Sequence, residues 1–346
     1  MSDLPDGVIW DVTYACPLRC VHCYSESGRR PSRRLSDADM LRVADAIVAM
    51  RPQGVAIAGG EPLLVRNIVE VIDRMAGAGL EVALYTSGWA MTGETARRLA
   101  ETCGRIAVSV DGATPGTHDR IRARKGSFAH AMRALRLLDE ISAEHRTRSG
   151  RPVSFGIDCV LLQRNFTEMA ALCEVVAPRF PELGFIAFGA VVPGGLANRP
   201  GFDEHELLTE EQIKLLNDPA HGRRLRTLAP ESVTVTSTDN RILQMHPELV
   251  AKGAVINALQ LEPDGEARAM PMYEGTVGNI LHEPAEVLWK RARARWSDPF
   301  VVAALSPART MRQWAEAARR IDYHFGSDAV RARLDRRLLS FGPDST

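Results

Sequence analysis

Three cysteines lie close together near the N-terminus, at Cys16, Cys20 and Cys23. Cysteine thiolates are ligands typical of iron–sulfur clusters and of zinc. A closed structural zinc site needs four ligands, and the sequence holds no second CxxC pair to supply them, although His22 is available as a fourth ligand. Three cysteines on a four-iron cluster leave one iron open to a small molecule. We therefore predict an iron–sulfur cluster, with a zinc site and three unligated structural cysteines as the alternatives.

A second short motif, Gly59-Gly60-Glu61-Pro62, follows directly after an apolar segment. Adjacent glycines allow a tight turn that exposes backbone polar groups, and the proline restricts the residue before it. A carboxylate fixed in this way can hold an ammonium group, so Glu61 is a candidate binding residue. The same four residues are also typical of an ordinary turn at the end of a strand.

A third group of polar residues follows a later apolar segment. Ser109 ends that segment, and Arg122 lies a short distance further along the chain. The Ser109 hydroxyl can either bind a ligand or cap the following helix. Arg122 can either bind a carboxylate or join a helix to the rest of the fold by a salt bridge. The sequence leaves both pairs of alternatives open.

Short apolar segments alternate with helical segments between residue 8 and residue 191. Strands are predicted at residues 8–13, 54–58, 80–86, 105–110, 153–162 and 185–191. Helices are predicted at residues 36–50, 65–78, 92–103, 127–145 and 167–177, the first of them opening on a capping box at Ser36. Six such units predict an α/β fold with a parallel sheet, either doubly wound or a full or partial barrel. Functional sites in such folds lie at the carboxyl ends of the strands.

The CxxxCxxC spacing of the three cysteines resembles the hallmark of the radical S-adenosylmethionine (radical SAM) superfamily. The resemblance implies a partial (β/α)6 barrel with one [4Fe–4S] cluster on Cys16, Cys20 and Cys23. In that family the open iron chelates S-adenosylmethionine, and one-electron reduction cleaves this cofactor to a 5′-deoxyadenosyl radical that abstracts hydrogen from a substrate. His22, within the same loop, is a further candidate for cofactor binding.

The later motifs resemble the same superfamily. Gly60 and Glu61 match its GGEP motif, which contacts the amino group of the cofactor. The stretch from Ser109 to Arg122 is similar to a run found in relatives with SPASM or twitch domains. That similarity implies that Ser109 contacts the cofactor and that Arg122 binds its carboxylate. Ser87, at the end of the third predicted strand, departs from the family pattern and receives no role.

The adenosine end of the cofactor is expected near Asp158 or residues 188–190, where no motif fixes the contact. Two residues are candidates for donating a hydrogen atom to a substrate radical. Cys159 carries a thiol but lies in an apolar run, and Tyr273 carries a phenol in the C-terminal region. Packing is the alternative for both side chains.

The C-terminal region follows a different pattern. A strand is predicted at residues 232–237 and a hairpin across residues 255–270. We predict three domains: a barrel at 1–225, a small α/β appendage at 226–296 and a helical segment at 297–346.

Part of the appendage resembles the SPASM signature, but Met270 stands where that signature has cysteine. No cysteine follows Cys173. Because a thioether cannot replace a bridging thiolate, we predict one cluster in the whole chain and a degenerate, cluster-free appendage that acts as a lid or substrate platform.

The amino-acid composition limits which classes of molecule the protein is expected to bind. Lys and Arg together number 43, as do Asp and Glu, so the formal net charge is zero and no overall field attracts nucleic acid. The sequence holds no apolar run long enough to span a membrane and no signal peptide at its start, so we expect a cytoplasmic protein.

The radical SAM resemblance also implies an electron donor of the flavodoxin or ferredoxin type, which the arginine-rich residues 29–34 are candidates to meet. The substrate is expected to be a ribosomal peptide or a small molecule such as a sugar, a nucleoside or a cofactor precursor. Only a few residues precede the first predicted strand, so a leader peptide would need a separate binding protein. A zinc-stabilised, non-catalytic binding protein is the alternative from another functional class.

Overall fold

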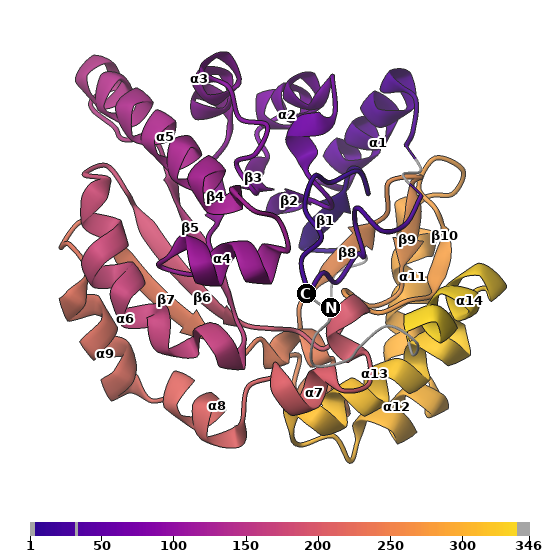
Figure 1. Cartoon of the computed structure of the whole chain (residues 1–346). Coiled ribbons are helices and arrows are strands. Elements are labelled where there is room, and N and C mark those ends of the chain that lie inside the picture. The colour runs from indigo at the N-terminus through magenta and orange to yellow at the C-terminus, as the bar shows by residue number, and fades with distance from the viewer. Residues whose placement is uncertain (1–3, 32–33, 338–346) are drawn as a thin grey trace.

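In the part of the chain that the structure describes, ten strands form one continuous sheet with helices along its outer face (Figure 1). The structure is a computed structural model, and it describes residues 4–31 and 34–337. The strand order is β10-β9-β8-β1-β2-β3-β4-β5-β6-β7. The strands are β1 (Gly7–Asp11), β2 (Gly54–Ala58), β3 (Glu81–Thr86), β4 (Arg105–Ser109), β5 (Phe155–Leu161), β6 (Phe185–Ala190), β7 (Thr234–Thr238), β8 (Ala258–Leu261), β9 (Glu266–Arg268) and β10 (Thr276–Asn279).

Strands β1 to β6 are neighbours in chain order, and every pair among them is parallel. Side chains alternate between the two faces of each strand. In β1, for example, Val8 and Trp10 are buried in the core, and Ile9 between them lines an interior cavity. The α/β fold with a parallel sheet, predicted from the alternation of apolar segments, is confirmed.

The helices that connect these strands are α1 (Asp37–Met50), α2 (Ile68–Gly77), α3 (Gly93–Thr102), α4 (Pro115–Arg122) and α5 (Ser127–Ser149). Helix α1 begins where its capping box predicts, because the Ser36 hydroxyl accepts a hydrogen bond from Asp39 N at 3.1 Å. Its buried face carries Met40, Val43 and Ile47, whose spacing follows the helical repeat.

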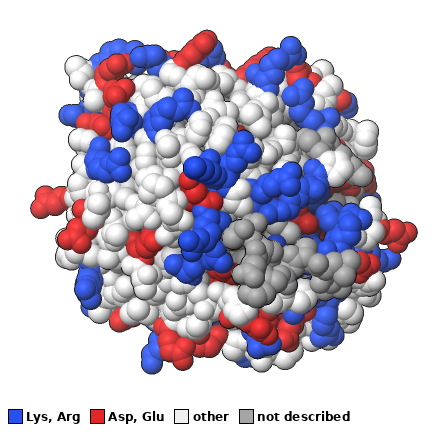
Figure 2. All heavy atoms as spheres, viewed as in Figure 1, with Lys and Arg blue, Asp and Glu red and all other residues white. Residues whose placement is uncertain are grey.

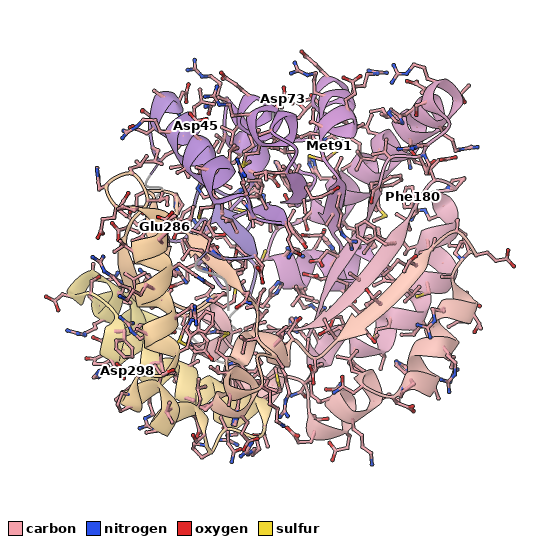
Figure 3. All side chains as sticks on the ribbon, turned by 180° about the vertical axis from the view of Figure 1, so that it is seen from behind. Asp45, Asp73, Met91, Phe180, Glu286 and Asp298 are labelled. Atoms are coloured by element: carbon pink, nitrogen blue, oxygen red, sulfur yellow. The ribbon has the colours of Figure 1, made fainter. Side chains whose placement is uncertain are left out.

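Exposed ion pairs join neighbouring helices on the outer surface. Arg74 of α2 lies 2.6 Å from Asp45 of α1, and Arg98 of α3 lies 2.5 Å from Asp73 of α2. Figure 3 labels both carboxylates on the outer helices. Exposed pairs of this kind contribute about 0–1 kcal/mol each. The helices are therefore held mainly by their apolar faces.

The helix expected at residues 167–177 is broken into short pieces. A 3₁₀ turn at Gln163–Glu168 precedes α6 (Met169–Ala171), a π-helical turn at Leu172–Val176 follows, and a second 3₁₀ turn covers Ala177–Arg179. Pro178 lacks a backbone N–H group, which prevents a regular helix from continuing through it.

The last strands have partners that the sequence pattern does not reveal. The strand expected at residues 232–237 forms β7 and pairs in parallel with β6. The hairpin expected across 255–270 forms β8 and β9, and β8 also pairs in parallel with β1. The sheet therefore continues past residue 225, where the sequence suggests a domain boundary. The separate appendage remains a prediction.

The remaining helices are α7 (Phe202–His205), α8 (Glu210–Leu216), α9 (Pro219–Leu228), α10 (Pro247–Ala251), α11 (Ala285–Trp296), α12 (Pro299–Leu305), α13 (Met311–Phe325) and α14 (Asp328–Arg337). Helix α11 lies beside β10, and Trp296 Nε1 donates a hydrogen bond to Ala269 O at 2.9 Å. Asp298, labelled in Figure 3, caps α12 by accepting from Phe300 N at 2.8 Å. None of the helices within residues 4–31 and 34–337 has both the length and the apolar character of a membrane span.

Candidate active site

The three cysteines lie in the loop that follows β1, which we call the cysteine loop (residues 14–28). Cys20 is buried, and Cys16 and Cys23 are partly exposed. All three line one cavity of about 440 Å³. Candidate residues from other parts of the chain line the same cavity, namely His22, Gly60, Ser109, Arg122 and Asp158. The fold therefore gathers the motifs that follow β1, β2 and β4 around one cavity.

A glycine closes the cysteine loop. Gly28 N donates a hydrogen bond to Tyr14 O at 2.9 Å, which joins the two ends of the loop. Gly28 has a φ of +76°, and a Cβ atom at this position would lie 2.5 Å from Leu18 O. Only glycine fits both the backbone conformation and the close approach.

The other side of the loop is attached to the end of α4. Arg19 N donates to Arg122 O at 3.2 Å, and Val21 N donates to Ile121 O at 2.9 Å. The Arg122 side chain reaches the same loop, with Nη1 3.8 Å from Cys20 Sγ. Helix α4 therefore positions the middle of the loop through both backbone and side chain.

Arg122 also forms a buried ion pair. Its Nε atom lies 2.6 Å from Asp111 Oδ2, and Nε2 of His22 lies 3.7 Å from the same oxygen. Burial alone would raise the pKa of Asp111, but the Arg122 guanidinium holds it below its usual value. Burial lowers the pKa of His22 to about 4, so the imidazole is neutral at neutral pH. Arg122 thus both lines the cavity and forms the salt bridge that the sequence offered as its alternative role.

The thiol groups fit a positively charged metal centre. Burial raises the pKa of Cys20 to about 11, with Arg122 opposing the shift, and burial also raises the pKa of Cys16. Both are therefore thiols at neutral pH unless a metal cation stabilises the thiolate. Leu18 N donates to Cys16 Sγ at 3.4 Å, as Arg122 does to Cys20 Sγ, and such donors stabilise thiolate ligands.

Three sulfur donors on one cavity wall suit a cluster held by three cysteines. A site for a single metal ion is a different arrangement, in which the ligands lie close together around one point. Among the described residues, no three His, Cys, Asp or Glu side chains are placed in that way.

Gly60 lies directly against the start of the cysteine loop. Gly60 N donates to Thr13 O at 2.7 Å, and Glu61 N donates to Ala15 O at 2.9 Å. A Cβ atom at Gly60 would lie 2.2 Å from Ala15 O. The second motif is therefore a close backbone approach that requires glycine, as its residue types suggest.

The Glu61 carboxylate is held by other residues of the chain, two of which line the cavity. Glu61 is fully buried and is not among the cavity-lining residues. Its carboxylate accepts hydrogen bonds from Leu63 N at 3.2 Å, from the Thr86 hydroxyl at 2.7 Å, and from both the N–H and the hydroxyl of Ser87. Glu61 thus joins the turn after β2 to the end of β3. Its contact with a cofactor remains a prediction.

Sequence reasoning gave no role to Ser87 and none to Thr86. The signal was present, because Thr86 ends β3 and Ser87 follows it at the carboxyl edge of the sheet, where polar groups of neighbouring strands meet. Their partner, however, is a residue 25 positions away from Thr86 in the chain, which no local pattern indicates.

The far side of the cavity is formed by β4, β5 and the chain after β6. Ser109 and Asp158 are partners in register on neighbouring strands, and both line the cavity. Burial, with a smaller contribution from Asp111, raises the pKa of Asp158 to about 6. Asn240 lines the same cavity and was missed by the sequence analysis. The remaining wall on this side is apolar, with Val160, Ala190, Val191, Val192, Leu243, Ile256 and Met272.

The two candidate hydrogen donors do not line the cavity. Cys159 is 1% exposed and alternates with Asp158 and Val160, so its side chain lies on the opposite face of β5. The Tyr273 hydroxyl is buried, donates to Gln244 O and accepts from Trp314 Nε1, each at 2.8 Å. The structure therefore assigns a packing position to both side chains.

Comparisons with known proteins agree with the cysteine motif. Residues 10–153 match the radical SAM superfamily. The mycofactocin maturase MftC of Mycobacterium ulcerans (strain Agy99) is 39% identical over 134 residues, which are 38% of this chain and 36% of that protein. An AdoMet-dependent heme synthase of Oleidesulfovibrio alaskensis is 27% identical over 309 residues, covering 82% of this chain and 74% of that protein. This chain thus spans only about a third of the length of the maturase.

Solved structures show the same fold. SuiB of Streptococcus suis, bound to its precursor peptide SuiA, aligns with a TM-score of 0.63 at 13% identity, covering 91% of this chain and 71% of that one. SuiB has also been solved with S-adenosylmethionine bound. Residues 10–153 are thus similar to the radical SAM superfamily, and most of the chain shares its fold with SuiB.

Proposed function

We propose that this chain is a radical SAM enzyme that holds one [4Fe–4S] cluster on Cys16, Cys20 and Cys23, cleaves S-adenosylmethionine and abstracts hydrogen from a natural-product substrate. The convergence of the three cysteines, Gly60 and Arg122 on one cavity supports this proposal most strongly. These residues come from three separate segments, and their types match the three motifs of the family.

The chain's own residues would bind and orient the reactants. When bound, the cluster and S-adenosylmethionine supply one-electron cleavage and an organic radical. The three thiolates hold the cluster, while Leu18 N–H and Arg122 donate to two of the sulfurs. The turn at Gly60 lines the cavity beside the cysteine loop, and Glu61 joins this turn to the end of β3. Hydrogen bonds already present in the folded chain reduce the reorganisation that binding requires.

We favour a ribosomal peptide as the substrate, because the maturase MftC is similar in sequence and SuiB, solved with a precursor peptide, is similar in fold. A small molecule such as a cofactor precursor is the second candidate. It is favoured by the heme synthase relative, which aligns over most of both chains. The mainly apolar far wall of the cavity suits the side chains of a peptide or an apolar ring.

We also propose that the cluster is the only one in the chain. The sequence contains no cysteine after Cys173. Met270, which stands where the SPASM signature has cysteine, is 2% exposed and belongs to the apolar core. The neighbouring Met272 lines the cavity, so this region forms part of the cavity wall and is proposed to act as a substrate platform.

The reaction needs an electron donor, for which we propose a cytoplasmic protein of the flavodoxin or ferredoxin type. Figure 2 shows Lys and Arg side chains gathered near the centre of one face, with Asp and Glu mostly toward its rim. A basic surface of this kind suits an acidic donor protein. A separate protein that binds a leader peptide is the further partner we propose for a peptide substrate.

Metal analysis of anaerobically purified and reconstituted protein tests this proposal. We expect about four irons and four sulfides per chain. About eight irons would contradict the single cluster, and one zinc without iron would support the non-catalytic binding protein instead.

A further inference from the structure

Glu26 is a buried carboxylate at the end of the cysteine loop. It lies three residues after Cys23, and its N–H donates to Cys23 O at 3.4 Å. Its side chain is only 6% exposed. The backbone φ is +53°, in the left-handed region that residues other than glycine rarely occupy. Surrounding interactions must therefore hold this residue in place.

Two arginines of α14 provide those interactions. Arg333 Nε donates to Glu26 Oε1 at 2.7 Å, and Arg337 Nη2 donates to the same oxygen. Arg333 is 307 residues away from Glu26 in the chain. Burial alone would raise the pKa of Glu26, but the two guanidinium groups hold it below its usual value. Hydrogen bonds between ionised groups are the strongest that side chains form, and burial protects them from screening by salt.

Helix α14 is itself anchored on the body of the protein. Arg333 also pairs with Glu274, a buried carboxylate that follows β9. Arg337 Nη1 donates to Asn198 Oδ1 at 3.2 Å, and Asn198 Nδ2 donates to Asp322 of α13 at 2.9 Å. The arginines that hold Glu26 are thus fixed by other contacts and do not depend on the loop for their position.

A second contact attaches the same side of the loop. Leu196 N, in the segment that follows β6, donates to Cys23 O at 3.0 Å. That segment continues to Asn198, which accepts from Arg337. The loop from Cys23 to Glu26 therefore lies against α14 and its neighbours, whereas the middle of the loop lies against α4.

We propose that Glu26 is a positioning residue, and that its ion pair with Arg333 lets α14 hold the cysteine loop in the shape that directs the thiols into the cavity. The loop is then fixed between two helices, α4 on one side and α14 on the other. This inference rests on the proposed function for its significance, because the loop is proposed to hold the cluster. The ion pair itself joins side chains of the metal-free protein, so it can be tested without cofactors.

Hydrogen–deuterium exchange of the metal-free, full-length protein tests the contact directly. We expect Arg333→Ala to speed exchange of the backbone amides at residues 14–28 about tenfold, because a charge-assisted hydrogen bond is lost. Exchange in β2 to β4 should not change. Arg336→Ala is the matched control, since Arg336 lies on the same helix but is exposed. Unchanged exchange of the loop in Arg333→Ala would overturn the proposal.

A double-mutant cycle separates Glu26 from Glu274, because Arg333 pairs with both. If Arg333 acts on the loop through Glu26, the combined Glu26→Gln and Arg333→Ala protein should exchange no faster at the loop than the faster single variant. Multiplied effects would show that Arg333 and Glu26 act on the loop independently, and would overturn the proposed role of their ion pair. If Arg333→Ala does not fold, Arg333→Lys takes its place in the cycle.

The reconstituted protein gives a second readout. Iron loss to a chelator should be about tenfold faster in Glu26→Gln than in the wild type and in Arg336→Ala, and equal rates would count against the proposal. If the wild type takes up no iron at all, the proposed function fails. The exchange experiment would still decide whether α14 holds the loop.

Discussion

The Nε atom of Arg122 lies 2.6 Å from Oδ2 of Asp111, and both side chains are buried. The same guanidinium reaches Cys20 Sγ at 3.8 Å. Asp111 in turn accepts a hydrogen bond from Val160 N of β5 at 2.9 Å. One buried ion pair therefore links the cysteine loop, α4 and β5.

Removing the charge of Asp111 should destabilise the protein. Asp111→Asn leaves the Arg122 guanidinium buried without its carboxylate, and breaking a buried pair in this way costs about 3–5 kcal/mol. Chemical denaturation of the metal-free protein measures the loss. Asp45→Asn is the matched control because its pair with Arg74 is exposed, and it should change stability by less than about 1 kcal/mol. Equal losses of stability in the two variants would show that the buried ion pair contributes no more than the exposed one.

Gly60→Ala should distort the contact between the second motif and the cysteine loop. The added methyl group would lie 2.2 Å from Ala15 O, so the backbone must move, and we expect a loss of about 1–3 kcal/mol. Gly77→Ala serves as the control, since a Cβ atom there meets nothing within 4 Å in α2. Thermal unfolding of both variants makes the comparison. A Gly60→Ala protein as stable as the wild type would refute the close approach.

Glu61→Gln should destabilise the turn after β2. The groups that surround the carboxylate donate hydrogen bonds to it, including the Thr86 hydroxyl and Ser87 N. The NH2 group of glutamine is itself a donor and would face one of them. We expect a loss of about 1–3 kcal/mol in the free energy of unfolding. Glu70→Gln, at an exposed position of α2, should change it by less than about 0.5 kcal/mol. A neutral Glu61→Gln would contradict the supporting role of Glu61.

Asp158 should make folding stability depend on pH. Its pKa is about 6 in the folded protein, against about 3.9 in an unfolded chain. As the pH rises from 4 to 6, the unfolded chain loses this proton first, so the wild type loses stability across that window. Asp158→Asn lacks this loss, and from pH 4 to pH 7 it should gain about 2 kcal/mol relative to the wild type. A constant difference between the two proteins across that range would show that Asp158 titrates normally.

The residues that local sequence could identify are those whose role depends on their own neighbourhood. The three cysteines share one short loop, and Gly60 is required by its immediate backbone surroundings. Strands β1 to β6 follow from apolar segments that alternate with helices. Such features carry their signal within a few residues, and the structure contains them close to the expected positions.

The local sequence does not indicate which residues far apart in the chain form hydrogen bonds or ion pairs with one another. Nothing in the local pattern shows that Thr86 and Ser87 bind Glu61, or that Glu26 pairs with Arg333. The face of a strand also matters, because Cys159 is one residue from Asp158 and yet lies on the opposite side. Residue type alone had made Cys159 and Tyr273 candidates, whereas packing decides where they point.

Formation of 5′-deoxyadenosine is the sharpest test of radical SAM chemistry in this chain. The reconstituted wild type is reduced under anaerobic conditions with S-adenosylmethionine, and the product is quantified beside that of Cys20→Ala, with circular dichroism to confirm that both are folded. We expect 5′-deoxyadenosine from the wild type and none above background from Cys20→Ala, because two thiolates cannot hold the cluster. Equal amounts from both proteins, or none from a wild type that carries four irons, would contradict this expectation.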